Sequence, residues 1–143
     1  MTPKTVKIIG GLGLFPFILG VLATLDFTFV FYNYNYILVE MSLIYAALIL
    51  SFLGGSIFAF ESINADKRSN LCLWLSICPT LWAFLAINLP NFSASFLAIG
   101  FLAVYEIDRR AFLVKKTPPW WLSIRFPLTT TVVLALVIIG FHG

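Results

Sequence analysis

The chain is poor in the residue types from which most active sites are built. It contains one histidine and two cysteines among 143 residues, and only 10% of its residues are charged, whereas an ordinary soluble domain has about 25%. One histidine and two separated cysteines do not make up a metal site. No serine or threonine within the apolar runs has a histidine or lysine at helical spacing to activate it as a nucleophile. We therefore expect no enzyme activity, no metal and no cofactor.

Charge is missing altogether from long stretches of the sequence. The runs without Asp, Glu, Lys or Arg are 8–25, 41–60, 69–105 and 126–143. A helix needs about 20 apolar residues to cross a bilayer, so the longest run should form two helices that meet at the turn-forming segment Asn88–Asn91. We predict an all-α polytopic membrane bundle, one domain over 1–143, with transmembrane helices at about 6–25, 41–60, 71–88, 92–107 and 126–141.

The basic residues all fall on one side of this five-helix topology. They are Lys4, Lys7, Lys67, Arg68, Arg109, Arg110, Lys115, Lys116 and Arg125. Cytoplasmic loops carry the excess of Lys and Arg in membrane proteins. We therefore predict an N-terminus on the cytoplasmic or matrix side and a C-terminus outside. The net charge of +3 is then a topology signal that favours anionic lipid over nucleic acid as a partner.

The first apolar run has two interpretations. Lys4 and Lys7, followed by apolar residues, also occur in secretory signal peptides. The run is long for a signal core, and Pro16 lies in its middle. We expect an uncleaved membrane anchor that is kinked at Pro16.

Small side chains recur every four residues in the second predicted helix. In a bilayer, small residues at this spacing let helices approach closely. The third predicted helix carries a similar stripe that includes Cys72, with a proline expected to kink it, so the simplest model is a hairpin in which the two stripes meet. The predicted packing residues are Ala47, Ser51, Gly54, Gly55, Ala59, Ser76, Pro79 and Thr80.

Three charged residues at the predicted helix ends are candidates for a functional role. Glu61, Asp108 and Arg125 share the cytoplasmic side of the topology. Glu61 lies at a helix C-terminus, where the helix dipole disfavours an anion, and we expect it to pair with Lys67 or Arg68. The spacing of Glu106 and Arg110 predicts a local ion pair.

Aromatic residues mark both membrane surfaces. The connection 26–40 alternates aromatic and polar residues, which is typical of an aromatic belt at the headgroups; the alternatives are the rim of a ligand site or a short strand. Before the last helix, we predict a short interfacial helix. The expected anchors are Tyr32, Tyr34, Tyr36, Trp120 and Trp121.

Several segments resemble a family of small membrane proteins, the domain of unknown function 3429, which includes the transmembrane protein 69 group. The segments are Tyr45–Gly55, Pro79–Ala83, Gly100–Phe101 with Asp108, Pro119–Trp121 and Arg125–Thr129. The chain departs from the family pattern after the glycine pair, where Ser56–Ala59 replaces a basic residue and a tryptophan. The resemblance implies a multi-helix protein of a bacterial inner or mitochondrial inner membrane, and it implies no catalytic residue.

Together these features predict a non-enzymatic protein of the membrane. Small-residue stripes and the lack of a charge in mid-membrane favour a structural, assembly or accessory component of a membrane complex. Its partners would be the lipid bilayer and other membrane subunits or a second copy. The alternative is a small oligomeric carrier or pore for an apolar solute or lipid. A membrane enzyme acting on lipid or quinone ranks last, because no acid–base pair is evident.

Overall fold

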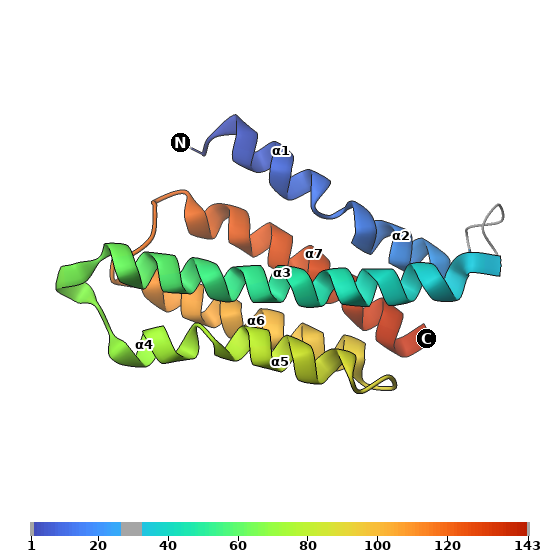
Figure 1. The fold of residues 1–143 in the computed structure, drawn as a ribbon. Coiled ribbons are helices and arrows are strands. Elements are labelled where there is room, and N and C mark those ends of the chain that lie inside the picture. Colours follow the sequence, from blue (N-terminus) through green and yellow to red (C-terminus); the bar gives the residue numbers. More distant parts are fainter. Residues whose placement is uncertain (1, 27–32, 143) are drawn as a thin grey trace.

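The computed structural model describes residues 2–26 and 33–142, and the regular elements in these ranges are helical. Two pairs of consecutive helices, α1 with α2 and α4 with α5, each continue one another across a short break, so the bundle has five long helical units (Figure 1). This confirms the predicted all-α class. The helices are α1 (Lys4–Leu12), α2 (Phe15–Thr24), α3 (Asn35–Ile63), α4 (Asn70–Leu75), α5 (Cys78–Ile87), α6 (Ser93–Leu113) and α7 (Trp121–His142), with a 3₁₀ turn η2 (Ala65–Lys67).

Four of the helical units are long and apolar enough to cross a membrane. They are Lys4–Thr24, Asn35–Ile63, Asn70–Ile87 and Trp121–His142. The fifth unit, α6, has 21 residues, but its last turns carry four charged residues, Glu106, Asp108, Arg109 and Arg110. By length and composition, these helices are compatible with a multi-pass membrane protein. Both α3 and α6 are longer than the predicted 41–60 and 92–107.

Two prolines interrupt the helices in which we predicted kinks. Helix α1 ends at Leu12, four residues before Pro16, and α4 ends at Leu75, four residues before Pro79. A proline has no N–H to donate to the carbonyl four residues earlier, and its ring clashes with that carbonyl. Both predicted kinks are present, and at each of them two residues interrupt the regular helix.

The prediction of a separate interfacial helix before the last span is wrong. Helix α7 runs without a break from Trp121 to His142 and contains Pro127. Its first turn is held against the bundle by a ring contact between Trp121 and Phe60 and by an ion pair of Arg125. These contacts keep the first turn in line with the rest of the helix, so Pro127 does not end it.

Helix α3 lies at the centre of the bundle. It packs against α2, α5 and α6, and α7 closes the bundle by packing against α6 and α2 (Figure 1). The core is apolar through its middle. Its largest fully buried apolar side chains are those of Phe17, Leu50, Leu97, Phe101 and Leu136.

Candidate functional site

The two ends of the bundle differ in charge. The N-terminus, the connection from α3 to α4 and the connection from α6 to α7 lie at one end, and the C-terminus lies at the other (Figure 1). We call the first the basic end, because these segments and the helix turns beside them carry the nine Lys and Arg residues. The candidate residues Glu61, Asp108 and Arg125 all lie at this end, where they are buried.

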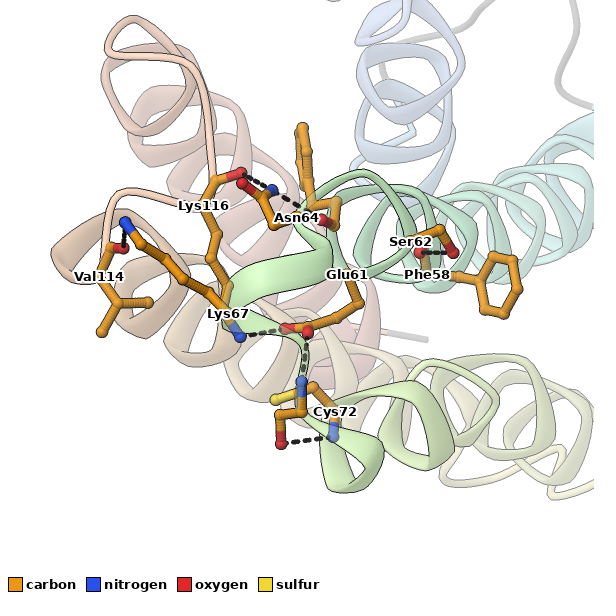
Figure 2. Close-up of polar contacts among 10 residues, drawn as sticks. Phe58, Glu61, Ser62, Asn64, Lys67, Cys72, Val114 and Lys116 are labelled. Carbon is orange, nitrogen blue, oxygen red and sulfur yellow. Dashed lines mark hydrogen bonds and ion pairs between the residues drawn. The ribbon is translucent and has the colours of Figure 1, made fainter.

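Glu61, in the last turn of α3, is held by two donors from other parts of the chain. The Lys116 ammonium lies 2.7 Å from Oε1, and the backbone N–H of Ser69 donates to Oε2 at 2.9 Å (Figure 2). The side chains of Glu61 and Lys116 are 4% and 9% exposed. The expected partners Lys67 and Arg68 do not bind this carboxylate in the described part of the chain, so that prediction is wrong. Each of them instead donates to a backbone carbonyl.

Hydrogen bonds from side chains to backbone carbonyls join the two connections of the basic end around this ion pair. The Asn64 side chain donates to the carbonyl of Lys116 at 3.0 Å, and Lys67 donates to the carbonyl of Val114 at 3.3 Å (Figure 2). Both bonds link the α3–α4 connection to the α6–α7 connection. The Glu61–Lys116 pair therefore lies inside a network that fixes the two loops to each other.

The second buried ion pair joins α6 to α7. Arg125 Nε donates to Asp108 Oδ2 at 2.8 Å, and the two side chains are 7% and 1% exposed. One terminal nitrogen of Arg125 and the hydroxyl of Thr129, one turn further along α7, are buried without a hydrogen-bond partner among the described residues. A buried charge is tolerated when it is paired in this way, so Asp108 and Arg125 stabilise each other at the contact between α6 and α7.

An aromatic contact connects the two ion pairs. The rings of Phe60 and Trp121 meet edge to face with their centres 5.0 Å apart. Phe60 precedes Glu61 in α3, and Trp121 lies one turn before Arg125 in α7. We call the four paired residues Glu61, Lys116, Asp108 and Arg125 the polar cluster. It joins the basic ends of α3, α6 and α7.

A third group of charges at this end is exposed. Glu106 accepts from Arg109 Nε at 2.8 Å and from Arg110 Nε at 2.9 Å. The predicted Glu106–Arg110 pair is confirmed, and Arg109 is an additional partner. Two guanidinium groups share one carboxylate, so this face of α6 keeps a net positive charge.

The predicted packing residues that belong to α3 are divided between two faces of this helix. Gly54 faces α5, where a Cβ would lie 2.5 Å from the carbonyl oxygen of Ser76 and 3.4 Å from the ring of Pro79. The hydroxyls of Ser51 and Thr80 share a hydrogen bond of 3.0 Å across the same pair of helices. The α3–α5 hairpin is therefore present.

Only the first half of the proposed stripe lies in the bundle, however. Ala47 is buried, but Gly55 and Ala59 are exposed, and a Cβ on Gly55 would meet nothing within 4 Å. The rotation of α3 buries Leu50, Gly54 and Glu61 instead. The contact thus follows a face one residue away from the predicted one.

The expected interfacial anchors lie at both ends of the bundle. Tyr34 and Tyr36 are 57% and 77% exposed at the start of α3, while Tyr32 and most of the possible strand fall outside the described residues. Trp120 and Trp121 are half-buried at the start of α7. Both tryptophans therefore pack partly against the bundle.

The polar cluster contains two carboxylates, an ammonium and a guanidinium group, each paired with a group of opposite charge. In residues 2–26 and 33–142, no three His, Cys, Asp or Glu side chains lie close enough to hold one metal ion. Sequence reasoning selected Glu61, Asp108 and Arg125 but missed Lys116. Lys116 is 55 residues from Glu61, so no local spacing pointed to the pair.

These features define an all-helical membrane-type protein with a buried polar cluster at its basic end. The chain belongs to the DUF3429 family of proteins of unknown function, whose model matches residues 2–141. This confirms the resemblance to that family, while the narrower relation to the transmembrane protein 69 group stays a prediction. No curated protein and no solved structure matches the chain.

Proposed function

We propose that this protein is a non-enzymatic accessory or assembly component of a membrane complex, which docks another transmembrane helix on the outward face of α3. One observation carries the proposal. Gly55 and Ala59, four residues apart, are exposed on that face, and a Cβ on Gly55 would meet nothing within 4 Å. Small residues four apart let transmembrane helices pack closely, and the chain's own helices leave this pair uncovered.

The side chains beside this notch are large and apolar. Leu48, Phe52 and Phe58 are 63%, 67% and 54% exposed. A small-residue notch between bulky side chains suits a helix that inserts a ridge into a groove. The partner is another membrane subunit or a second copy of this chain, and both lie in the lipid bilayer. We expect neither a cofactor nor a nucleic acid to take part.

The proposed topology has five spans, with the N-terminus in the cytoplasm or matrix and the C-terminus outside. It is supported by the gathering of the nine basic residues at one end of the bundle and by the positive-inside rule. It takes α6 as a span whose charges lie at its basic end. The family resemblance supports a bacterial inner or mitochondrial inner membrane.

Photo-crosslinking in the native membrane tests the docking face. A photoreactive amino acid at Ala59 should give one discrete protein adduct, and the same group at the exposed Val137 of α7 serves as the control. The adduct should disappear when Gly55→Leu fills the notch. Lipid adducts alone at both positions, or an adduct that survives Gly55→Leu, would contradict the proposal.

The alternative of a small oligomeric carrier or pore is tested separately. Flux or lipid scrambling in proteoliposomes above that of empty liposomes would favour it. The accessory role instead predicts no flux from the folded protein.

A further inference from the structure

A shallow groove runs along the outside of the bundle between α6 and α7. Its volume is about 210 Å³. Sites that enclose drug-sized ligands have volumes of about 300–1,000 Å³, so this groove suits a single hydrocarbon chain better than an entire drug-sized ligand. It is lined by Leu102, Tyr105, Phe126, Thr129, Thr130, Val133 and Leu134.

The wall of the groove is apolar and faces away from the core. Leu102, Phe126 and Leu134 are 53%, 59% and 58% exposed. The hydroxyl of Thr130 donates to the carbonyl of Phe126 in its own helix at 2.8 Å. Because this hydroxyl is already bonded, a hydrocarbon chain that lies beside Thr130 leaves it satisfied. The hydroxyl of Thr129, which also lines the groove, is buried without a partner among the described residues, so an apolar chain takes no hydrogen bond from it.

One end of the groove leads to positive charge. Leu102, Tyr105 and Arg109 lie three and four residues apart on α6 and therefore share one face. Arg109 and Arg110 both bind Glu106, and their side chains are 50% and 77% exposed. The guanidinium groups thus keep a net positive charge and further N–H donors, and a planar fork of this kind matches the geometry of phosphate.

We propose that this groove binds one acyl chain of an anionic phospholipid, with the lipid phosphate at Arg109. Charge complementarity selects this occupant, because the apolar groove ends at a cationic face of the same helix. A zwitterionic lipid would present the same chains with a weaker attraction to Arg109. A basic residue beside the headgroup of a bound lipid contributes roughly a fivefold preference for anionic lipid at that one site.

Native mass spectrometry of the full chain from nanodiscs tests the site. The nanodiscs contain equal amounts of phosphatidylglycerol and phosphatidylcholine with identical chains. The wild type should retain phosphatidylglycerol about fivefold over phosphatidylcholine. Thr130→Trp, which fills the groove, should abolish retention of both lipids. Arg109→Gln should leave a lipid bound but bring the ratio of the two close to one.

Two control variants match these changes. Thr131→Trp alters a neighbouring exposed threonine, which also bonds a carbonyl of α7. Thr131 does not line this groove but a second one, between α2 and α7. Lys7→Gln removes an exposed cation of the basic end. Both controls should behave as the wild type. A wild-type ratio near one, equal retention by Thr130→Trp and Thr131→Trp, or an unchanged ratio in Arg109→Gln would overturn the proposal.

Discussion

Gly54 and Gly55 are neighbours in α3, yet they lie in different surroundings. A Cβ on Gly54 would collide with the backbone of the break between α4 and α5, whereas a Cβ on Gly55 would meet nothing within 4 Å. The inward face of α3 continues to Glu61, which is 3% exposed. The outward face continues to Ala59, which is exposed. One helix therefore holds the chain together with one face and presents a small-residue notch with the other.

Glycine spacing alone does not reveal which face of a helix is buried. Both faces contain small residues, and both are compatible with close packing in a bilayer. The position of Glu61 distinguishes the inward face of α3 from the outward face, because this side chain must reach Lys116 and Ser69. A buried charge is stable only with such partners, so this requirement helps to set the rotation of α3.

The largest expected effect comes from Glu61→Ala on the inward face. This change leaves the Lys116 ammonium buried without its carboxylate, and removing one partner of a buried pair costs on the order of 3 kcal/mol. Unfolding in mixed detergent micelles should show this loss of stability. The double variant Glu61→Met with Lys116→Met should recover most of it, because no unpaired charge remains. A single variant as stable as the wild type would show that the pair does not hold the basic end.

Gly54→Leu should have the next largest effect. The new side chain meets the carbonyl of Ser76 and the ring of Pro79, and overpacking of this kind costs about 1–3 kcal/mol. Thermal unfolding in detergent would measure it. The matched control is Gly55→Leu, since it makes the same change one residue away. Equal losses for the two variants would refute the difference between the faces.

The sequence was sufficient to predict the helices but not their rotations. Uncharged runs of about 20 residues are a strong signal, and they located all five helical units. The continuity of α7 across Pro127 was missed, because Arg125 and Trp121 hold its first turn through partners on other helices. A local pattern contains no information on such contacts.

Sequence analysis selected three of the four residues of the polar cluster but predicted neither of its two ion pairs. Asp108 and Arg125 were both selected as charged residues at helix ends on one side of the membrane, and they pair with each other. The expected partner of Glu61 came from the nearest loop, whereas the actual partner, Lys116, comes from a loop that only the folded bundle brings close.

Ser51→Ala should have a smaller effect than either change above. It removes the hydrogen bond to Thr80 between α3 and α5, and such bonds between membrane helices contribute about 0.6 kcal/mol on average. The double variant Ser51→Ala with Thr80→Ala should lose about 0.6 kcal/mol less than the sum of the two single losses, because the shared hydrogen bond is lost only once. A double-mutant cycle in mixed micelles gives the coupling, and a coupling of zero would show that the two hydroxyls do not bond each other in the folded protein.

Gly55→Leu should have the smallest effect on the chain itself. Glycine is a poorer helix former than leucine, and no neighbouring atom within 4 Å opposes the larger side chain. The isolated protein should therefore keep its stability within about 0.5 kcal/mol, as exposed substitutions usually do. Size-exclusion chromatography of freshly extracted membranes should nevertheless show loss of any larger assembly, because the notch on α3 is filled. If the isolated chain melted earlier, the outward face would belong to the fold. A docking face differs from a packing face in this respect: filling the docking face removes the assembly but leaves the stability of the isolated chain unchanged.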